Sequence, residues 1–317
     1  MSQDTGLTAR ASPGKQARRR VAGRIVGSMN LARRLRHRTE YIAFLAIAAL
    51  IRALPLEMAS RWSGAGWRLV APRLGRHGRA LQNLALAFPE KSPAEIEGIA
   101  RGMWDNLGRT FAEFFHLQEI VEGDRIAFER PEMLDAMRAR GGGMVACGLH
   151  LGNWEITAQA AVRCGAQAAG VYQKITNPLV DAYVNAVRAP FYPGGLMEKS
   201  PRTARSMLRH AREGGCAAFL ADQREGRGID APFFGRPAPS ATFPAQVARA
   251  AGAPLYVCRA KRLDGVRFSL RVEEVAVPRT ADREADVAAA TRAVQATFER
   301  MIRDAPDQWM WAHRRWR

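Results

Sequence analysis

The chain has 317 residues, and its 48 Lys and Arg against 30 Asp and Glu give a formal charge of +18, so anionic partners are expected. The length supports a sizeable hydrophobic core. Its four cysteines lie far apart without a C-x-x-C pair and its six histidines form no close cluster, which favours reduced core thiols in a cytoplasmic compartment and no catalytic metal.

The first forty residues form a basic arm with ten Lys or Arg and two acids. We predict that residues 1–40 are disordered in solution. Such an arm suits phospholipid headgroups or nucleic acid. It lacks interleaved aromatic residues, and the chain has no helix-turn-helix, finger or single-strand-binding signature, so we expect an anionic membrane surface and no nucleic acid as its partner.

An apolar run of eleven residues follows from Tyr41 to Ile51 and ends at Arg52. Because spanning a bilayer requires about 20 apolar residues, this run favours a helix in the membrane interface, with a tilted span as the rival. A cleaved signal peptide is disfavoured, since the apolar core begins late and no small-residue cleavage site follows. We predict a membrane-associated helical segment over residues 41–75.

Residues 76–317 are predicted to form one α/β domain, with a mainly parallel sheet covered by helices. Ser92 to Glu95 has capping-box spacing before an amphipathic pattern, which indicates a helix packed on the core. Farther along, expected strands alternate with expected helices, as in a parallel sheet covered by helices. The strands are Ala166 to Tyr172, Cys216 to Ala221, Pro254 to Arg259 and Val266 to Val272, and the helices are Pro178 to Arg188, Pro201 to Arg212, Pro244 to Ala251 and Ala285 to Asp304.

The segment His150 to Glu155 places an imidazole and a carboxylate five positions apart, where an apolar strand over Gly143 to Leu149 hands over to a helix that begins near Asn153. Residues five apart on one helix lie ~140° apart, so only a strand-to-helix break lets the two side chains meet. A histidine can take a proton from a hydroxyl once a carboxylate fixes its tautomer. We expect His150 to be the base and Glu155 to hold its ring, with a turn-capping histidine as the alternative.

The segment HLGNWE at His150 resembles the H-x-x-x-x-D/E signature of glycerolipid and lysophospholipid acyltransferases, in the form of the bacterial lipid A biosynthesis (lauroyl and myristoyl) acyltransferases. Further segments match this family in order from about Tyr41 to Arg317, which makes the resemblance more specific than one motif. They are Asn83-Leu84, Phe88-Pro89-Glu90, Asn106 to Arg109 with Glu113, Asn177-Pro178-Leu179 with Arg188, Asp222-Gln223, Pro232 to Gly235, Gly252-Ala253-Pro254 and Pro306 to Trp316. The basic arm and residues 224–228 depart from the family pattern.

The resemblance implies a glycerolipid acyltransferase-like fold and an enzyme on the cytoplasmic face of the inner membrane. It would move a fatty acyl group from acyl carrier protein to a hydroxyl of a lipid A precursor, a phosphorylated glycolipid, without a cofactor. The charge of +18 fits both an acidic carrier protein and this acceptor. The alternatives are the same chemistry on a lysophospholipid, ornithine lipid or phosphatidylinositol mannoside, and an inert membrane-binding homologue, against which intact His150 and Glu155 argue.

Three further residues are expected at the substrate site. Asp222 follows an expected strand, at the edge where ligands gather in parallel sheets and where His150 also falls, so we expect the two to share one cleft. Asp222 resembles the acid of the family's D-Q block, with orientation of the site as the alternative to proton transfer. Arg188 matches the arginine of the N-P-L block, and its fork would hold an acceptor phosphate or pair with Asp222 or Glu155, with a solvated helix end as the alternative. Backbone amides near Gly152 and Asn153, or the Asn153 side chain, are the candidate donors to the developing oxyanion.

Two aromatic segments carry open alternatives. Phe233-Phe234-Gly235 is expected either to wall the acyl groove or to pack against the core. The tail residues Trp309, Trp311 and Trp316, with neighbouring arginines, have the character of a surface that meets lipid headgroups, and sealing the domain is the alternative.

Overall fold

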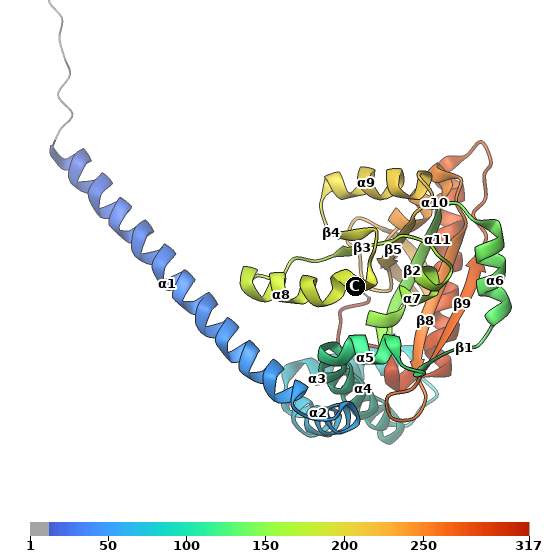
Figure 1. Ribbon diagram of the computed structural model, residues 1–317, viewed down its shortest axis with the longest axis horizontal. Coiled ribbons are helices and arrows are strands. Elements are labelled where there is room, and N and C mark those ends of the chain that lie inside the picture. The colour runs from blue at the N-terminus through green and yellow to red at the C-terminus, as the bar shows by residue number, and fades with distance from the viewer. Residues whose placement is uncertain (1–12, 317) are drawn as a thin grey trace, which may run out of the picture.

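The computed structural model describes residues 13–316, with the side chains of residues 31–200 and 202–316, and its centre is a sheet covered by helices on both faces (Figure 1). The strands of this sheet are β1 (Ile126–Phe128), β2 (Met144–Gly152), β3 (Ala168–Tyr172), β4 (Gly195–Glu198), β5 (Cys216–Leu220), β8 (Leu255–Arg262) and β9 (Phe268–Val275), while β6 (Ile229–Phe233) and β7 (Arg236–Ser240) form a separate hairpin. The α-helices are α1 (Pro13–Arg52), α2 (Leu56–Val70), α3 (Gly75–Ala87), α4 (Pro93–Glu113), α5 (Leu117–Glu122), α6 (Pro131–Arg140), α7 (Gln159–Arg163), α8 (Pro178–Arg188), α9 (Pro201–Arg212), α10 (Phe243–Ala251) and α11 (Arg283–Asp304).

The strands follow the order β1-β9-β8-β2-β5-β3-β4. Every neighbouring pair in this sheet is parallel except β8 and β9, which are antiparallel. The predicted α/β class with a mainly parallel sheet is therefore confirmed. The other expected strands and helices of the domain are present with small shifts at their ends, but the helix expected from near Asn153 begins only at Gln159, after a 3₁₀ turn. The capping box at Ser92 forms, with its backbone N 2.8 Å from Glu95 Oε2.

The side chains of β2 divide between the two faces of the sheet. Its odd-numbered residues from Val145 to Leu151 are fully buried in a core shared with α3, α4, α10 and α11. The even-numbered residues face the second core, which includes side chains of α5, α6 and α7. Ala146 and His150 are only partly buried on that face, although β2 is a central strand. Their exposure indicates a hollow above the middle of the sheet.

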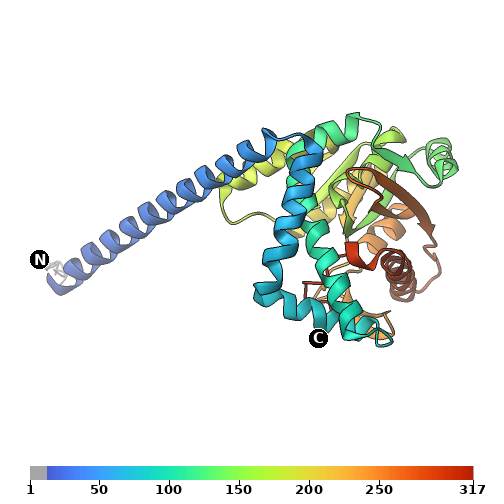
Figure 2. The ribbon, with the colours of Figure 1, turned by 90° about the horizontal axis from the view of Figure 1, so that it is seen from below.

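The N-terminal segment forms one long helix that ends against the domain (Figure 2). Because α1 begins at Pro13, it includes residues 13–40 of the predicted arm, and the predicted boundary at residue 40 falls inside this helix. Good helix formers such as Ala, Arg and Leu dominate this stretch. Residues 1–12 of the predicted arm lie outside the described residues. Among the described helices, none is long and apolar enough to cross a membrane.

The segment after α1 belongs to the packing of the domain. Along α2, Ser63 Oγ donates to Gly108 O of α4 at 2.7 Å. A Cβ added at Gly108 would lie 2.6 Å from Ser63 O, so the two helices touch through their backbones. The fully buried Ser60 of α2 donates to Glu113 of α4 at 2.7 Å. Helix α2, which lies within the predicted segment 41–75, therefore packs closely on α4.

Candidate active site

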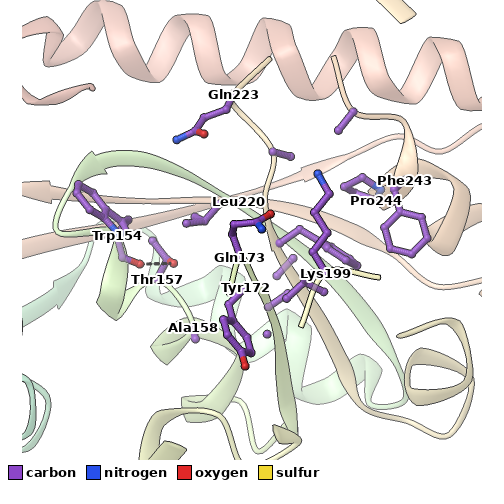
Figure 3. Close-up of a pocket in the computed structure, with 18 of the residues that line it drawn as sticks. Trp154, Thr157, Ala158, Tyr172, Gln173, Lys199, Leu220, Gln223, Phe243 and Pro244 are labelled. Carbon is purple, nitrogen blue, oxygen red and sulfur yellow. Dashed lines mark hydrogen bonds between the residues drawn. The ribbon is translucent and has the colours of Figure 1, made fainter. Parts of the chain in front are cut away.

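A cavity of about 680 Å³ lies over the carboxyl ends of β2, β5 and β3, and Figure 3 shows Trp154, Gln223 and Lys199 around it. Its lining includes His150, Glu155 and Arg188. We predicted the site at this edge of the sheet, because ligands of parallel sheets collect beyond the ends of the strands.

Small residues form part of the cavity lining where the strands are in register. Ala146 of β2 lies beside Ala218 of β5, and Ala218 lies beside Gly170 of β3. Two positions farther along β2, Gly148 also lines the cavity. Because these side chains are small, they leave open space above the sheet. The face of the sheet below His150 is therefore low, in this sense, and apolar over three neighbouring strands.

His150 contacts a carboxylate from the neighbouring strand. The residue lies near the end of β2, and Asp222 follows β5, which runs parallel beside it. Nδ1 of His150 is 2.8 Å from Oδ1 of Asp222, and the backbone N of His150 donates to Oδ2 at 2.9 Å. Trp309 Nε1 donates to the same Oδ2 at 2.7 Å. The carboxylate is thus held at two oxygens and is 1% exposed.

The electrostatics of this pair fix the form of the ring. Burial raises the pKa of Asp222, but the charge of His150 and the hydrogen bonds from His150 and Trp309 outweigh burial and hold that pKa below its usual value. The ionised carboxylate can only accept, so Nδ1 of His150 carries the hydrogen that it donates. In the neutral ring the lone pair is then on Nε2. A proton acceptor of this kind in the cavity wall can serve as a general base.

Glu155 contacts Arg188 instead of His150, which corrects our expectation for the carboxylate of the motif. Arg188 Nε donates to Glu155 Oε2 at 2.7 Å and Arg188 Nη2 donates to Oε1 at 2.5 Å. After β2 the chain enters a 3₁₀ turn, Trp154–Ile156, which directs Glu155 toward α8. Burial lowers the pKa of Arg188, but the charge of Glu155 outweighs it and raises that pKa. Among the expected partners of Arg188, the structure therefore shows the ion pair with Glu155.

Asn153 and Asp222 do not line the cavity, so neither lies where we expected it to meet substrate. Asn153 is fully buried, and its backbone N donates to Ala260 O at 3.1 Å. Its Nδ2 donates to Glu113 Oε2 at 3.0 Å, and its Oδ1 accepts from the backbone N of Glu155 at 3.2 Å. Because these donors are already used inside the fold, Asn153 caps the turn and is not a free oxyanion donor.

The model of the bacterial lipid A biosynthesis acyltransferase family matches residues 28–317. The chain belongs to this family. Lipid A biosynthesis acyltransferase 1 of Shigella flexneri and lipid A biosynthesis myristoyltransferase of Escherichia coli (strain K12) are each 27% identical to it over 256 residues, which is 76% of this chain and 76% of each relative. Lipid A biosynthesis acyltransferase 2 of Shigella flexneri is 26% identical over 277 residues, 81% of this chain and 80% of the relative. The expected family and the class of O-acyltransferase are confirmed.

A buried polar network supports the turn of the acyltransferase that follows His150. Gly152 O accepts from Asn106 Nδ2 and from Thr110 Oγ1, each at 3.0 Å. Glu113 accepts from Arg262 Nη2 at 2.8 Å. Gly152 has φ +59°, and a Cβ there would lie 1.8 Å from Ala260 O, so only glycine fits. The segment from Asn106 to Glu113, noted from sequence without a role, therefore holds this turn.

Two side chains beside His150 were not assigned to the site from sequence. Gln223 Nε2 is 3.3 Å from Nε2 of His150 and 3.0 Å from Nε2 of His313. Burial and the charge of His150 lower the pKa of His313. Gln223 could have been assigned to the site because it follows Asp222 in the chain. Nothing in the sequence connects His313 of the tail to the ring of His150. In the part of the acyltransferase that the structure describes, no three His, Cys, Asp or Glu side chains gather as metal ligands.

The aromatic tail seals the acyltransferase domain. Trp309, Trp311 and Arg315 are at most 2% exposed. The rings of Trp309 and Phe233 lie 5.7 Å apart, and those of Trp311 and Phe234 lie 5.6 Å apart. Neither phenylalanine lines the cavity. Both aromatic segments therefore pack inside the domain, which was the alternative in each case. These tryptophans are not a headgroup-binding surface.

Proposed function

We propose that this acyltransferase moves a fatty acyl group from acyl carrier protein to a hydroxyl of a phosphorylated lipid A precursor, at the cytoplasmic face of the inner membrane. The printed names of the relatives, which describe lipid A acyltransferases and a myristoyltransferase, support the acceptor class. The observation that carries the proposal is the His150–Asp222 pair, which opens on a partly apolar cavity.

In the proposed reaction, Nε2 of His150 removes the proton of the acceptor hydroxyl as its oxygen attacks the thioester carbonyl. The tetrahedral intermediate then breaks its carbon–sulfur bond, and the imidazolium returns the proton to the leaving thiolate. Asp222 acts as a positioning residue, since it contacts His150 and Trp309 and does not line the cavity. Its negative charge favours the imidazolium between the two steps.

Arg188 is the proposed donor to the negative charge that develops on the thioester oxygen. Glu155 uses its Nε and Nη2, and no described residue accepts from its Nη1. Arg188 and His150 line the same cavity. A guanidinium held by a buried carboxylate keeps one orientation, so it needs little reorganisation when charge develops. Glu155 is thus proposed to position Arg188.

The low apolar face of the sheet below His150 is the proposed position of the acyl chain. Ala146, Ala218 and Gly170 lie in register there, and Gly148 separates them from His150 along β2. An acyl chain on this face would place its carbonyl carbon near the ring. Burial of its methylene groups supplies the binding free energy, at about 0.8 kcal/mol each.

Attachment to the membrane is proposed to involve α1 and α2. These helices carry the following exposed large hydrophobic side chains: Leu31, Leu35, Ile42, Ile47, Leu50, Met58, Trp62, Leu69 and Val70. Arginines lie among them, as is typical of helices at a bilayer interface. Such a surface would keep the cavity near a lipid acceptor.

The proposal is tested with detergent-solubilised enzyme, radiolabelled lauroyl and myristoyl carrier protein and a tetra-acylated lipid A precursor. We expect label in the glycolipid with wild type, and a loss of about 10²–10⁴ in rate for His150→Ala at unchanged thermal stability. A folded His150→Ala variant with the wild-type rate would exclude the proposed base. Labelling of a lysophospholipid or ornithine lipid instead of the glycolipid would assign another acceptor.

A further inference from the structure

Helix α9 carries a row of cations on its outer face. Arg202, Arg205, Arg209 and Arg212 are all exposed. At 100° per residue they fall within an arc of about 80°. The opposite side of the helix is buried through Met207 and Ala211. The arginines therefore form one straight basic face, and we call these four residues the α9 stripe.

The stability of the helix does not explain this stripe. Its members are three and four positions apart, where like charges destabilise a helix. The sequence of α9 contains no Asp or Glu that would offset them. Arg202 and Arg205 form no hydrogen bond or ion pair with any described residue, and Arg209 meets Glu213 only at 4.0 Å on the open surface. Arg212 Nη2 donates to Ala250 O at 2.9 Å. A row of like charges that lowers helix stability, with two members that have no described partner, points to an anionic ligand.

The helix that carries the stripe also forms part of the cavity wall. Thr203 and Ala204 of the same helix line the cavity, so the first turn of α9 is part of its wall. Lys199, labelled in Figure 3, and the exposed Arg224 also line it. Thr203 and Ala204 lie on the side of α9 that is turned away from the stripe. A ligand held on the outer face of α9 would therefore be separated by this one helix from the cavity in which a thioester would reach His150.

We propose that the α9 stripe is the docking surface for the acidic carrier protein that delivers the acyl group. This inference rests on the proposed function. The stripe extends over about 15 Å on a convex surface, at 1.5 Å per residue. Recognition of one phosphate needs donors that converge on a point. A long row of positive charge instead complements an extended acidic surface, and charge complementarity of this kind speeds the encounter of proteins.

The position of α9 argues against the membrane as the ligand. In Figure 1 α9 lies at the top of the molecule and α2 at the bottom. The exposed large hydrophobic side chains include members of α1 and α2, but none from the described part of α9. An interfacial helix needs such side chains for insertion. A partner without lipid contact is therefore the better fit.

The test compares wild type with Arg202→Glu/Arg205→Glu. The matched control is Arg236→Glu/Arg267→Glu, which changes the charge equally at two exposed arginines, one at the start of β7 and one in the β8–β9 turn. Each protein is assayed with lauroyl carrier protein, with lauroyl coenzyme A and with varied tetra-acylated acceptor, at low and high salt. We expect the α9 variant to raise the KM for the carrier protein about tenfold at low salt and less at high salt. The kcat of the α9 variant and its rate with the coenzyme A thioester should equal those of wild type. The control variant should keep the wild-type KM for the carrier protein.

The outcomes separate this inference from the function on which it rests. If wild type uses the carrier protein and the α9 variant has an unchanged KM for it, the docking surface is wrong and the function stands. A rise in the KM for the acceptor alone would assign the stripe to the glycolipid phosphates and overturn the inference. If wild type transfers from coenzyme A but never from carrier protein, the proposed donor and the docking surface both fail.

Discussion

The carboxylate of Asp222 determines which nitrogen of His150 is free to accept a proton. The contact exists because β2 and β5 are parallel neighbours, so residues at the carboxyl ends of the two strands meet at one edge of the sheet. An amide at this position can present its NH₂ group to the ring and so favour the wrong tautomer.

We therefore expect Asp222→Asn to lower kcat by about 10²–10⁴ with little change in the KM for either substrate. The carrier protein assay measures both constants. Trp309→Phe is the control, because it removes one hydrogen bond from the same carboxylate but keeps its charge. If Asp222→Asn loses no more activity than Trp309→Phe, the carboxylate does not fix the tautomer.

The stability of the fold should also depend on this residue at acid pH. The pKa of Asp222 is lowered in the folded chain, so its ionisation stabilises the fold above the ordinary pKa of 3.8 and this contribution is lost as the pH falls through the lowered value. Denaturant unfolding from pH 7 to pH ~3 is expected to show a steeper loss of stability for wild type than for Asp222→Asn. Equal slopes would contradict the lowered pKa.

Sequence located His150 but assigned it the nearer acid. Glu155 is close in the chain, whereas Asp222 reaches the ring only through the strand order β2-β5 and its register, which residue spacing does not encode. The sequence did place Asp222 at the same edge of the sheet as His150, but it did not predict that β2 and β5 are direct neighbours, which brings the carboxylate to the ring. The turn after Gly152 then decided that Glu155 meets Arg188.

At the scale of elements, β2, β5 and β3 form the low face on which we place the acyl chain. Ala218 is at its centre, between Ala146 and Gly170. A larger side chain there would shorten the space below His150 without touching the ring. We expect Ala218→Leu to discriminate against the longest donors first.

The measurement is kcat/KM for a series of acyl carrier proteins from eight to fourteen carbons, as rough bounds of the range to test. Each methylene that no longer fits should cost about tenfold or more. Wild type measured on the same donors is the reference, and His150 remains intact in the variant. A uniform fall across all chain lengths would place the acyl chain elsewhere.

Helices were easier to predict than the topology of the sheet. Pro178–Arg188 and Pro201–Arg212 agree with prediction at both ends. Each start is marked by a proline at the first helical position and a polar residue before it. The antiparallel pair β8–β9 is the departure from the parallel pattern. The short connection at 263–267 excludes a parallel crossover, which needs a dozen or more residues, so this signal was available.

At the scale of the whole molecule, α1 projects from the domain and α2 packs against it (Figures 1 and 2). Trp62 and Leu69 of α2 are 57% and 62% exposed. We expect Trp62→Glu/Leu69→Glu to lower binding to anionic vesicles at least about tenfold. Each change removes apolar area that the bilayer would bury and adds a negative charge that the anionic lipid repels.

Vesicle sedimentation measures this binding. Ala136→Glu/Ala139→Glu in α6 adds two acids at exposed positions and serves as the control for charge alone. Equal loss of binding in both variants would show that the net charge attracts the membrane and that α2 does not insert. Unchanged binding in the α2 variant would leave α1 as the attachment.

Ser60 of α2 donates to Glu113, and Glu113 accepts from Asn153, which caps the turn that carries Glu155. Three consecutive contacts therefore connect the helix proposed to touch lipid with the carboxylate that orients Arg188. The helix proposed for membrane attachment therefore also supports the geometry of the proposed active site. A chimaera in which a foreign membrane anchor replaces the N-terminal helices would leave Glu113 without its serine partner. Such a protein is expected to reach the membrane without recovering its activity.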